Sequence, residues 1–244
     1  MNFWGKLAFA ASVALVSTAA FSMTDPAARL APQSQSQPPS SAPTLALDGT
    51  DASGDARYVE QWIHAKGDDH GLPFAIVDKK AARIFVFAAG GKLVGTTSTI
   101  LGLAHGDIPV PGAGQKDPSR LLPYERRTPA GRFESQPGKN LSGESVVWVD
   151  YDTGIAIHRI RPGKMQAARL HNIATSGIDD KRMSLGCVVV PESFFLQTVL
   201  PTLGHSHGVV YVLPEDGPVT AMFGNPAQNV ASARKVAVVS NAAR

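Results

Sequence analysis

The middle of the chain alternates short apolar runs, rich in β-branched and aromatic residues, with tight turn sequences. Three of these runs are Phe74–Val77, Arg83–Phe87 and Lys92–Thr97, and residues 78–80 and 89–91 separate them. Runs of this length, bounded by Gly, Asp and Lys, are typical of strands joined by hairpin turns. The pattern therefore predicts a β-meander.

A second group of apolar runs follows a long stretch that has no period. Residues 102–127 contain several Gly and Pro and predict a long loop, of a length that is usually functional or mobile. Beyond the loop, the Asp150/Asp152 pair is expected to shape the turn of a further hairpin. The strands predicted in this half lead on from Phe133 and cover residues 145–149, 154–160 and 208–213. The run 183–190 is apolar and β-branched, and Cys187 within it is expected between a loop and an apolar strand.

Helical periodicity is confined to short segments. Aromatic and small residues recur at three- to four-residue spacing from Asp55 onward, which predicts a helix that ends at Gly67 or Gly71. A weaker helical pattern covers residues 164–175. A third helix is predicted to carry Phe194–Phe195, whose rings we expect in the core.

The two ends of the chain differ in composition from the middle. Residues 1–22 combine a positive charge, an apolar stretch too short to span a membrane and a small-residue cleavage site, which is typical of a secretory signal peptide. Residues 23–54 are rich in Pro, Ser and Gln and predict a disordered linker. The folded domain is expected over residues 55–214, roughly 160 residues and enough for one core. Residues 215–244 are expected to form a peripheral tail, and no membrane span is predicted after signal cleavage.

Composition and charge narrow the class of protein. The formal net charge is +3 and the pI is about 9.1, but the basic residues are scattered, so no nucleic-acid partner is predicted. The 23 Gly and 18 Pro residues favour a strand- and turn-rich domain over a helical bundle. The predicted fold class is therefore mainly β.

Cys187 is the single cysteine of the chain. Exported proteins usually pair their cysteines in disulfides, so one cysteine indicates either a reactive thiol or an ordinary small buried residue. The preceding Gly186 allows close approach of the backbone to a substrate, and Ser184 places a hydroxyl nearby. A cysteine nucleophile also requires a base and N–H groups aimed at the developing oxyanion. The local residues suit acyl transfer.

The base must come from one of seven histidines. His158 lies in a clear strand pattern, although a strand histidine can equally be a half-buried structural residue. His171 lies in the segment that follows and is a weaker alternative base. His205 and His207 have the spacing of a chelating pair, but no third ligand accompanies them, so no metal is predicted.

Three sequence elements together resemble the L,D-transpeptidase (YkuD-like) family. The run Ser184–Val188 resembles the family's nucleophile motif, and Ile157-His158 precedes it at the end of a strand. Thr128–Phe133 is similar to the family's upstream Thr-Pro-x-Gly-x-Phe element. The elements follow the family's order over residues 73–213. The resemblance implies a YkuD-like β-sandwich of mixed sheets with one or two flanking helices. It also implies a secreted or periplasmic, wall-associated protein in cell-wall biogenesis and cell shape.

The same resemblance implies roles for individual residues. Cys187 would form a thioester with a peptidoglycan stem peptide, and His158 would take the thiol proton. N–H groups around Gly186 and Cys187 would hold the oxyanion, and Ser184 would support the loop. The acyl group would then pass to an amine. No cofactor is expected, because a thiolate–imidazolium pair needs none, and such a pair predicts a bell-shaped pH–rate profile.

Two features depart from the family pattern. Val189 stands where the family usually has Asn or Arg, two residues after the cysteine. The expected base and nucleophile are 29 positions apart, more than in many relatives, so residues 161–181 are expected to form an inserted lid or wall. Arg159 or Arg182 is expected to take over the contact with a substrate carboxylate.

Two other functions fit the same residues. With water as the acceptor, the Cys187–His158 site would belong to an L,D-carboxypeptidase or an amide hydrolase. Alternatively, the protein could have kept the fold and lost the activity, which would make it a non-catalytic peptidoglycan-binding module. Val189 favours this interpretation, whereas the presence of both Cys187 and His158 argues against it. Peptidoglycan stem peptides are the expected partner in each case, and the sequence predicts no oligomeric state.

Overall fold

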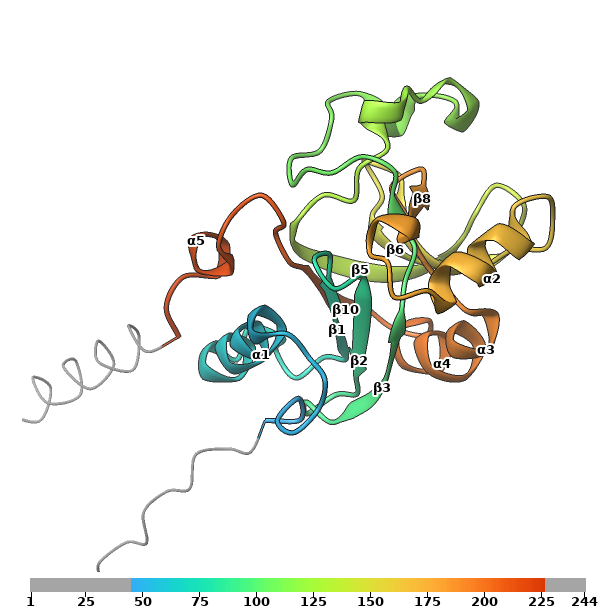
Figure 1. Cartoon of the computed structure of the whole chain (residues 1–244). Coiled ribbons are helices and arrows are strands. Elements are labelled where there is room, and N and C mark those ends of the chain that lie inside the picture. The colour runs from blue at the N-terminus through green and yellow to red at the C-terminus, as the bar shows by residue number, and fades with distance from the viewer. Residues whose placement is uncertain (1–44, 227–244) are drawn as a thin grey trace, which may run out of the picture. The chain divides into compact units, whose positions relative to one another are not determined.

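The computed structural model describes residues 45–226 (Figure 1). The predicted signal peptide, residues 23–44 of the predicted linker and residues 227–244 of the predicted tail lie outside this range. Within it, no helix is long and apolar enough to cross a membrane.

The described residues are organised around one mixed sheet of eight strands, in the order β3-β2-β1-β10-β5-β6-β7-β9. Two neighbouring pairs, β1 with β10 and β7 with β9, are parallel, and the other pairs are antiparallel. A separate short parallel pair joins β4 to β8. The strands are β1 (Phe74–Asp78), β2 (Arg83–Phe87), β3 (Leu93–Ser98), β4 (Leu101–Gly102), β5 (Gly131–Lys139), β6 (Ser145–Asp150), β7 (Ile155–Arg159), β8 (Arg182–Ser184), β9 (Val188–Val190) and β10 (Gly208–Val212).

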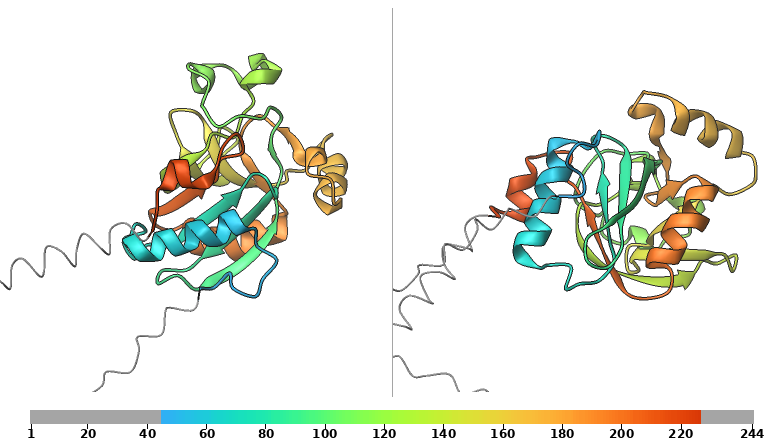
Figure 2. Two further views of the ribbon diagram at one scale, coloured as in Figure 1. Left: turned by 60° about the vertical axis from the view of Figure 1, so that its left-hand side comes forward. Right: turned by 90° about the horizontal axis from the view of Figure 1, so that it is seen from below.

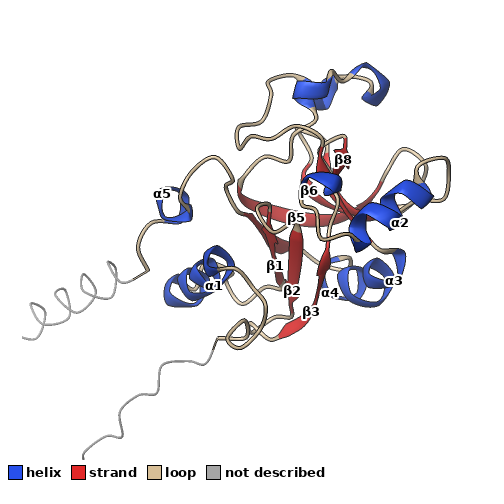
Figure 3. Ribbon diagram, viewed as in Figure 1, coloured by secondary structure: helices blue, strands red, loops and turns tan. Residues whose placement is uncertain are grey.

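Strand β5 joins the two halves of this sheet. Its first half pairs with β10, and its second half, from Gln136 onward, pairs with β6. At the far edge, Ile100 and Val189 exchange two backbone hydrogen bonds of 2.8 Å, which ties β9 to the segment after β3. The sheet therefore curls back toward itself, as Figure 3 shows. The prediction of a mainly β fold built from mixed sheets with flanking helices is confirmed.

Successive residues of β1 and β10 enter two different apolar cores. Ala75 and Val210 face the interior of the curled sheet, where the helical segment after β9 also packs. Phe74 and Tyr211 face the opposite side, which α1 and α5 cover (Figure 2). Because both faces are covered, these strands are apolar at nearly every position, as buried strands require. Phe195 is buried in the first core and Phe194 packs against it, as predicted.

The helices flank the sheet. Helix α1 has Ser53 as its N-cap, whose hydroxyl accepts from Ala56 N–H, and ends at Gly67 with φ of 60°. The predicted helix after residue 190 is continuous but contains a π-helical turn. The helices and π-turn are α1 (Gly54–Lys66), α2 (Gln166–Ala174), α3 (Glu192–Phe194), the π-turn Phe195–Val199, α4 (Leu200–Leu203) and α5 (Val219–Phe223).

The folded part of the chain extends beyond both predicted boundaries. On the N-terminal side, Leu47 is fully buried, and the Glu60 carboxylate accepts from the N–H groups of Ala46 (2.6 Å) and Leu47 (3.0 Å). On the C-terminal side, Val219 and Phe223 are buried in the core beneath α1. Residues 45–54 are therefore packed where a linker was expected, and residues 215–226 are part of the fold where a peripheral tail was expected.

Candidate active site

Cys187 lies in a short loop between two strands, directly before the apolar strand β9. Residues 185–187 separate β8 from β9, because Gly186 has φ of 130° and leaves the extended conformation. A Cβ at this position would lie 2.6 Å from the Arg127 carbonyl oxygen and 2.7 Å from Ile155 Cδ1. Gly186 is required both by its backbone angle and by the space around it.

Two hydroxyl groups hold this loop in place. Ser184 Oγ donates to the Cys187 carbonyl at 2.7 Å and accepts from Gly186 N–H at 3.0 Å. Thr128 Oγ1, fully buried, donates to the Gly186 carbonyl at 2.7 Å and accepts from Gly102 N–H at 2.9 Å. Ser184, the last residue of β8, and Thr128, in the Thr-Pro element, therefore both hold this loop through hydrogen bonds.

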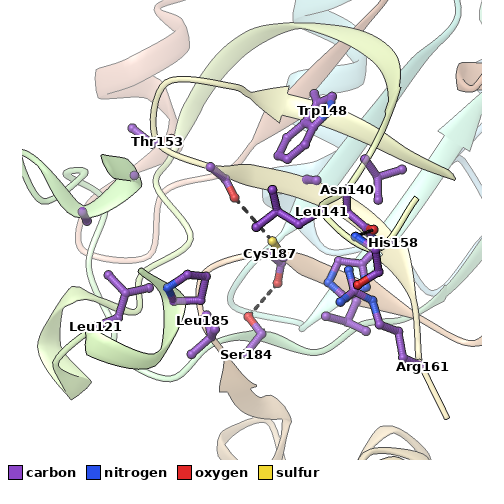
Figure 4. Close-up of a pocket in the computed structure, with 18 of the residues that line it drawn as sticks. Leu121, Asn140, Leu141, Trp148, Thr153, His158, Arg161, Ser184, Leu185 and Cys187 are labelled. Atoms are coloured by element: carbon purple, nitrogen blue, oxygen red, sulfur yellow. Dashed lines mark hydrogen bonds between the residues drawn. The ribbon is translucent and has the colours of Figure 1, made fainter. Parts of the chain in front are cut away.

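His158 lies on β7, the strand directly beside β9. The parallel register places His158 opposite Val189, two residues beyond Cys187. His158 Nδ1 is 2.8 Å from the Arg159 carbonyl oxygen. A carbonyl can only accept, so Nδ1 carries the hydrogen and Nε2 keeps its lone pair in the neutral ring. His158 and Cys187 both line one cleft, and Figure 4 labels both side chains in it.

The electrostatics of the cleft favour a neutral pair of side chains. Burial, together with the positive charges of Arg161 and Arg169, lowers the pKa of His158 to about 4. Burial raises the pKa of the Cys187 thiol, although the same two arginines oppose the rise. The thiol donates a weak hydrogen bond of 3.6 Å to the Gly154 carbonyl. Both shifts favour the neutral thiol and the neutral imidazole over the predicted thiolate–imidazolium pair.

The cleft has a volume of about 290 Å³ and polar and apolar walls. Trp148 from β6 and Leu141 from the loop before it form one side, as Figure 4 shows, and residues of the long loop 103–127 form another. Residues 161–181, predicted as an inserted lid or wall, contain α2 and contribute Arg161 and Arg169. Val189, the position that departs from the family pattern, lines the cleft as an apolar residue.

The two arginines predicted to contact a substrate carboxylate are engaged elsewhere. Arg159 pairs with Glu192 and, at 3.0 Å, with Glu144. Arg182 is buried, pairs with Glu215 and donates to the Lys79 carbonyl. Neither lines the cleft. Strand alternation directs Arg159 away from the face that carries His158, and Arg182, the first residue of β8, is buried beside Glu215.

Arg161 and Arg169 could not be singled out from the sequence. Both occur in the inserted segment, where the helical pattern is weak and no spacing distinguishes a cleft-facing arginine from a surface one. The one available indication was their position between the predicted base and the predicted nucleophile.

The predicted oxyanion site is also altered. Gly186 N–H is occupied, because it donates to Ser184 Oγ. Within residues 45–226, neither Cys187 N–H nor Leu185 N–H makes a hydrogen bond, so Cys187 N–H is one backbone donor of this loop that a substrate oxygen could meet.

The remaining candidates lie outside the cleft. His171 is an exposed residue of α2 and does not line the cleft. In the described part of the chain, no group of three or more His, Cys, Asp or Glu side chains could hold a metal, so the His205/His207 pair has no third ligand there. Asp150 Oδ1 accepts from the N–H groups of Asp152 and Thr153, which confirms that this pair shapes the hairpin turn.

Comparisons with known proteins give distant structural likenesses. No family model matches the sequence, and no curated protein matches it. One similar structure is a fused Zn-dependent amidase/peptidase/peptidoglycan-binding domain-containing protein of Clostridium acetobutylicum (16% identity, 64% of this chain and 60% of that chain, TM-score 0.34). Another is an L,D-transpeptidase of Enterococcus faecium (20%, 57% and 49%, 0.31). A third is the helical cell shape determining protein Pgp2 of Campylobacter jejuni (17%, 64% and 55%, 0.40).

The chain spans about half to three-fifths of the length of these structures. Likenesses with these identities and TM-scores do not assign the chain to a family.

Proposed function

We propose that the cleft performs acyl transfer through a Cys187 thioester, as in an L,D-transpeptidase. The observation that carries the proposal is the orientation of His158. Its Nδ1–H is held by the Arg159 carbonyl at 2.8 Å, so the basic Nε2 is the nitrogen available in the cleft that contains the thiol. A nucleophile, a base and a third group that orients the base are the three parts that activated nucleophiles share.

The reaction follows from these groups. The Cys187 S–H bond rotates away from Gly154, and His158 Nε2 accepts the proton. The thiolate attacks an amide carbonyl, a C–S bond forms, and Cys187 N–H donates to the developing oxyanion. The C–N bond then breaks, and the leaving amine takes its proton from the His158 imidazolium. An acceptor amine attacks the thioester in the reverse sequence and regenerates the thiol.

The choice of substrate rests on the sequence resemblance. The Thr128–Phe133 and Ser184–Val188 elements are similar to those of L,D-transpeptidases, and both act on the same loop through Thr128 and Ser184. We therefore propose a stem peptide of peptidoglycan as the acyl donor. A secreted or periplasmic location, proposed from residues 1–22, would bring the protein to that substrate.

The first test is the intact mass of the full chain after incubation with a carbapenem, an acyl donor that the resemblance implies. One covalent adduct per chain is expected, and Cys187→Ala should form none. His158→Gln should slow adduct formation by about 100-fold or more. His171→Gln is the matched control, because it removes the alternative base from α2 and should leave the rate unchanged. The proposal would be overturned if His158→Gln formed the adduct at the rate of the parent protein, or if Cys187→Ala formed an adduct.

The second test separates transfer from hydrolysis. A stem tetrapeptide is incubated with the protein, with and without a second peptide that supplies a free amine. A cross-linked product supports transpeptidation, whereas release of the last residue alone would identify a carboxypeptidase that uses the same pair. Binding of peptidoglycan without either product, and without an adduct in the first test, would identify a non-catalytic module.

A further inference from the structure

The cleft contains a guanidinium group that has no partner in the described chain. Arg169, on α2, lines the cleft together with Cys187 and His158. Within residues 45–226 its side chain makes no hydrogen bond or ion pair, and its Nε is buried without an acceptor. A partly buried cation is unfavourable unless an anion or a set of acceptors compensates it. The described part of the cleft therefore lacks a negatively charged group that would pair with Arg169.

The neighbouring charges do not supply that group. Arg161 Nε lies 2.8 Å from Glu144 Oε2, and the other oxygen of Glu144 is 3.0 Å from Arg159. Arg159 is also paired with Glu192. The two carboxylates near this wall are thus shared between Arg159 and Arg161, which leaves the charge of Arg169 uncompensated.

The unpaired charge shares its cleft with the reacting atoms, because Arg169, His158 and Cys187 all line it. In keeping with this, Arg169 contributes to the lowered pKa of His158 and opposes the rise in the pKa of Cys187 that burial causes. The side chains that line the cleft include apolar ones such as Val189 and Trp148, and none of them is a carboxylate. An anion that compensates Arg169 is therefore expected to arrive with the substrate.

We propose that Arg169 binds a free carboxylate of the acyl donor, on the residue that leaves. This inference rests on the proposed function and adds to it a specificity-determining residue. The donor is then a peptide cleaved at its last amide bond, because a C-terminal α-carboxylate lies one residue from the scissile carbonyl. The C–N bond of that amide breaks and the C–S bond to Cys187 forms. The departing amino acid keeps its carboxylate and takes the proton that His158 received from the thiol.

Binding in a variant that cannot react tests the carboxylate contact directly. The full chain with Cys187→Ala is titrated by calorimetry with a stem tetrapeptide that ends in a free carboxylate, and with the same peptide as a C-terminal amide. A hydrogen bond to a charged group strengthens binding markedly, so the peptide with the free carboxylate should bind about 10-fold more tightly than the peptide amide. Adding Arg169→Gln should remove this preference, and Arg169→Lys should keep part of it.

Lys164→Gln provides the matched control. Lys164 is an exposed cation of the same segment that does not line the cleft, so its removal should leave the preference for the acid unchanged. Because the Arg169 side chain makes no internal bond, Arg169→Gln should keep the circular dichroism spectrum and thermal midpoint of the parent. If the spectrum or the thermal midpoint of Arg169→Gln does change, Arg169→Lys serves as the second variant for the binding test.

The outcomes separate this inference from the proposed function. Equal affinity for acid and amide in the parent, or a preference that survives Arg169→Gln, would overturn the carboxylate site. Cleavage of the peptide amide by the intact enzyme as fast as cleavage of the free acid would also overturn the carboxylate site. It would leave the proposed thioester chemistry supported. An Arg169-dependent preference without any adduct or turnover would support the carboxylate site and overturn the proposed chemistry.

Discussion

The hydroxyl of Thr128 donates to the carbonyl of Gly186, the residue before the single cysteine, at 2.7 Å. The two residues are 58 positions apart, and Thr128 lies shortly before β5, whereas Gly186 lies between β8 and β9. The same hydroxyl accepts from Gly102 N–H at 2.9 Å. One buried side chain thus connects three separate segments around the loop that carries the thiol.

Replacing Thr128 by Val should destabilise the protein. Valine has the same shape but no hydroxyl, so the buried carbonyl of Gly186 and the N–H of Gly102 would lose their partners. Unsatisfied buried groups of this kind cost about 1–3 kcal/mol each, and we expect a loss of about 2–4 kcal/mol in the free energy of unfolding. Urea denaturation would measure it.

Thr128→Ser is the control for this change, because it keeps the hydroxyl and removes one methyl group. Its loss in unfolding free energy should be less than that of Thr128→Val by about 1–2 kcal/mol or more. Equal losses in the two variants would show that the methyl group, and not the hydrogen bonds, supports the loop.

Replacing Gly186 by Ala should be costly for two separate reasons. Its φ of 130° is unfavourable for a side chain, and the new Cβ would lie 2.6 Å from the Arg127 carbonyl oxygen. Strain and overpacking together predict a loss of about 2–5 kcal/mol in the free energy of unfolding and a displaced thiol. Urea denaturation and the rate of adduct formation at Cys187 would report the two effects.

Gly143→Ala isolates the first of these reasons. Gly143 has φ of 76°, but no atom lies within 4 Å of the place that a Cβ would take, so its substitution should cost only about 1–2 kcal/mol. If Gly143→Ala proves as destabilising as Gly186→Ala, the close contact with Arg127 cannot be the main constraint.

Lys79 should be essential for stability although it lies outside the cleft. It is fully buried, with Nζ 2.6 Å from Asp107 Oδ1 and 3.3 Å from Glu215 Oε1, and it donates to the Gly106 and Thr128 carbonyls at 2.9 Å. Lys79→Met would leave the Asp107 carboxylate and these two carbonyls without their cationic donor, while Glu215 would keep its pair with Arg182. Breaking a buried pair in this way costs about 3–5 kcal/mol, which thermal or urea unfolding would detect.

The adjacent lysine gives the matched control. Lys80 is partly exposed and pairs with Asp55 at 2.9 Å on the surface. Lys80→Met removes the same charge but should change the free energy of unfolding by about 1 kcal/mol or less. A Lys79→Met variant as stable as Lys80→Met would contradict the structural role of the buried network.

The pH dependence of acylation should have its acid limb near pH 4. The proposed base must be neutral to accept the thiol proton, and the pKa of His158 is lowered to about 4. The rate should therefore hold as pH falls through 6.5, the ordinary value for histidine, and decline only as pH approaches 4. Stopped-flow measurement of adduct formation across this range would show the limb.

Removing a nearby charge should move that limb in a known direction. Arg161 and Arg169 both lower the pKa of His158, so Arg161→Gln should raise it and shift the acid limb to higher pH. A limb that stays in place in this variant, or one already near 6.5 in the parent, would argue against His158 as the group that titrates.

Much of the fold could be predicted because its elements have local patterns. The strands near Phe74 and Arg83, the helix that ends at Gly67 and the core position of Phe195 all occur where spacing and turn residues indicated. The position of Cys187 between a loop and an apolar strand was also recognisable, but apolar composition alone does not reveal that Gly186 adopts a φ of 130°. The boundaries at 55 and 214 also shifted, since Leu47 and Phe223 are buried by contacts with distant residues.

The candidate site also contains some residues that local sequence could predict and others that only long-range contacts determine. The residue types in the chain were enough to select Cys187, His158, Ser184 and Gly186, since a thiol after a glycine and a histidine on a strand are recognisable from their neighbours alone. Which arginine faces the cleft was not recognisable. Arg159 is engaged by Glu144 and Glu192, while Arg169 remains unpaired within residues 45–226 and lines the cleft that holds the thiol. Ion pairs form between residues that folding brings together, so the availability of a charged side chain is a property of the packed molecule.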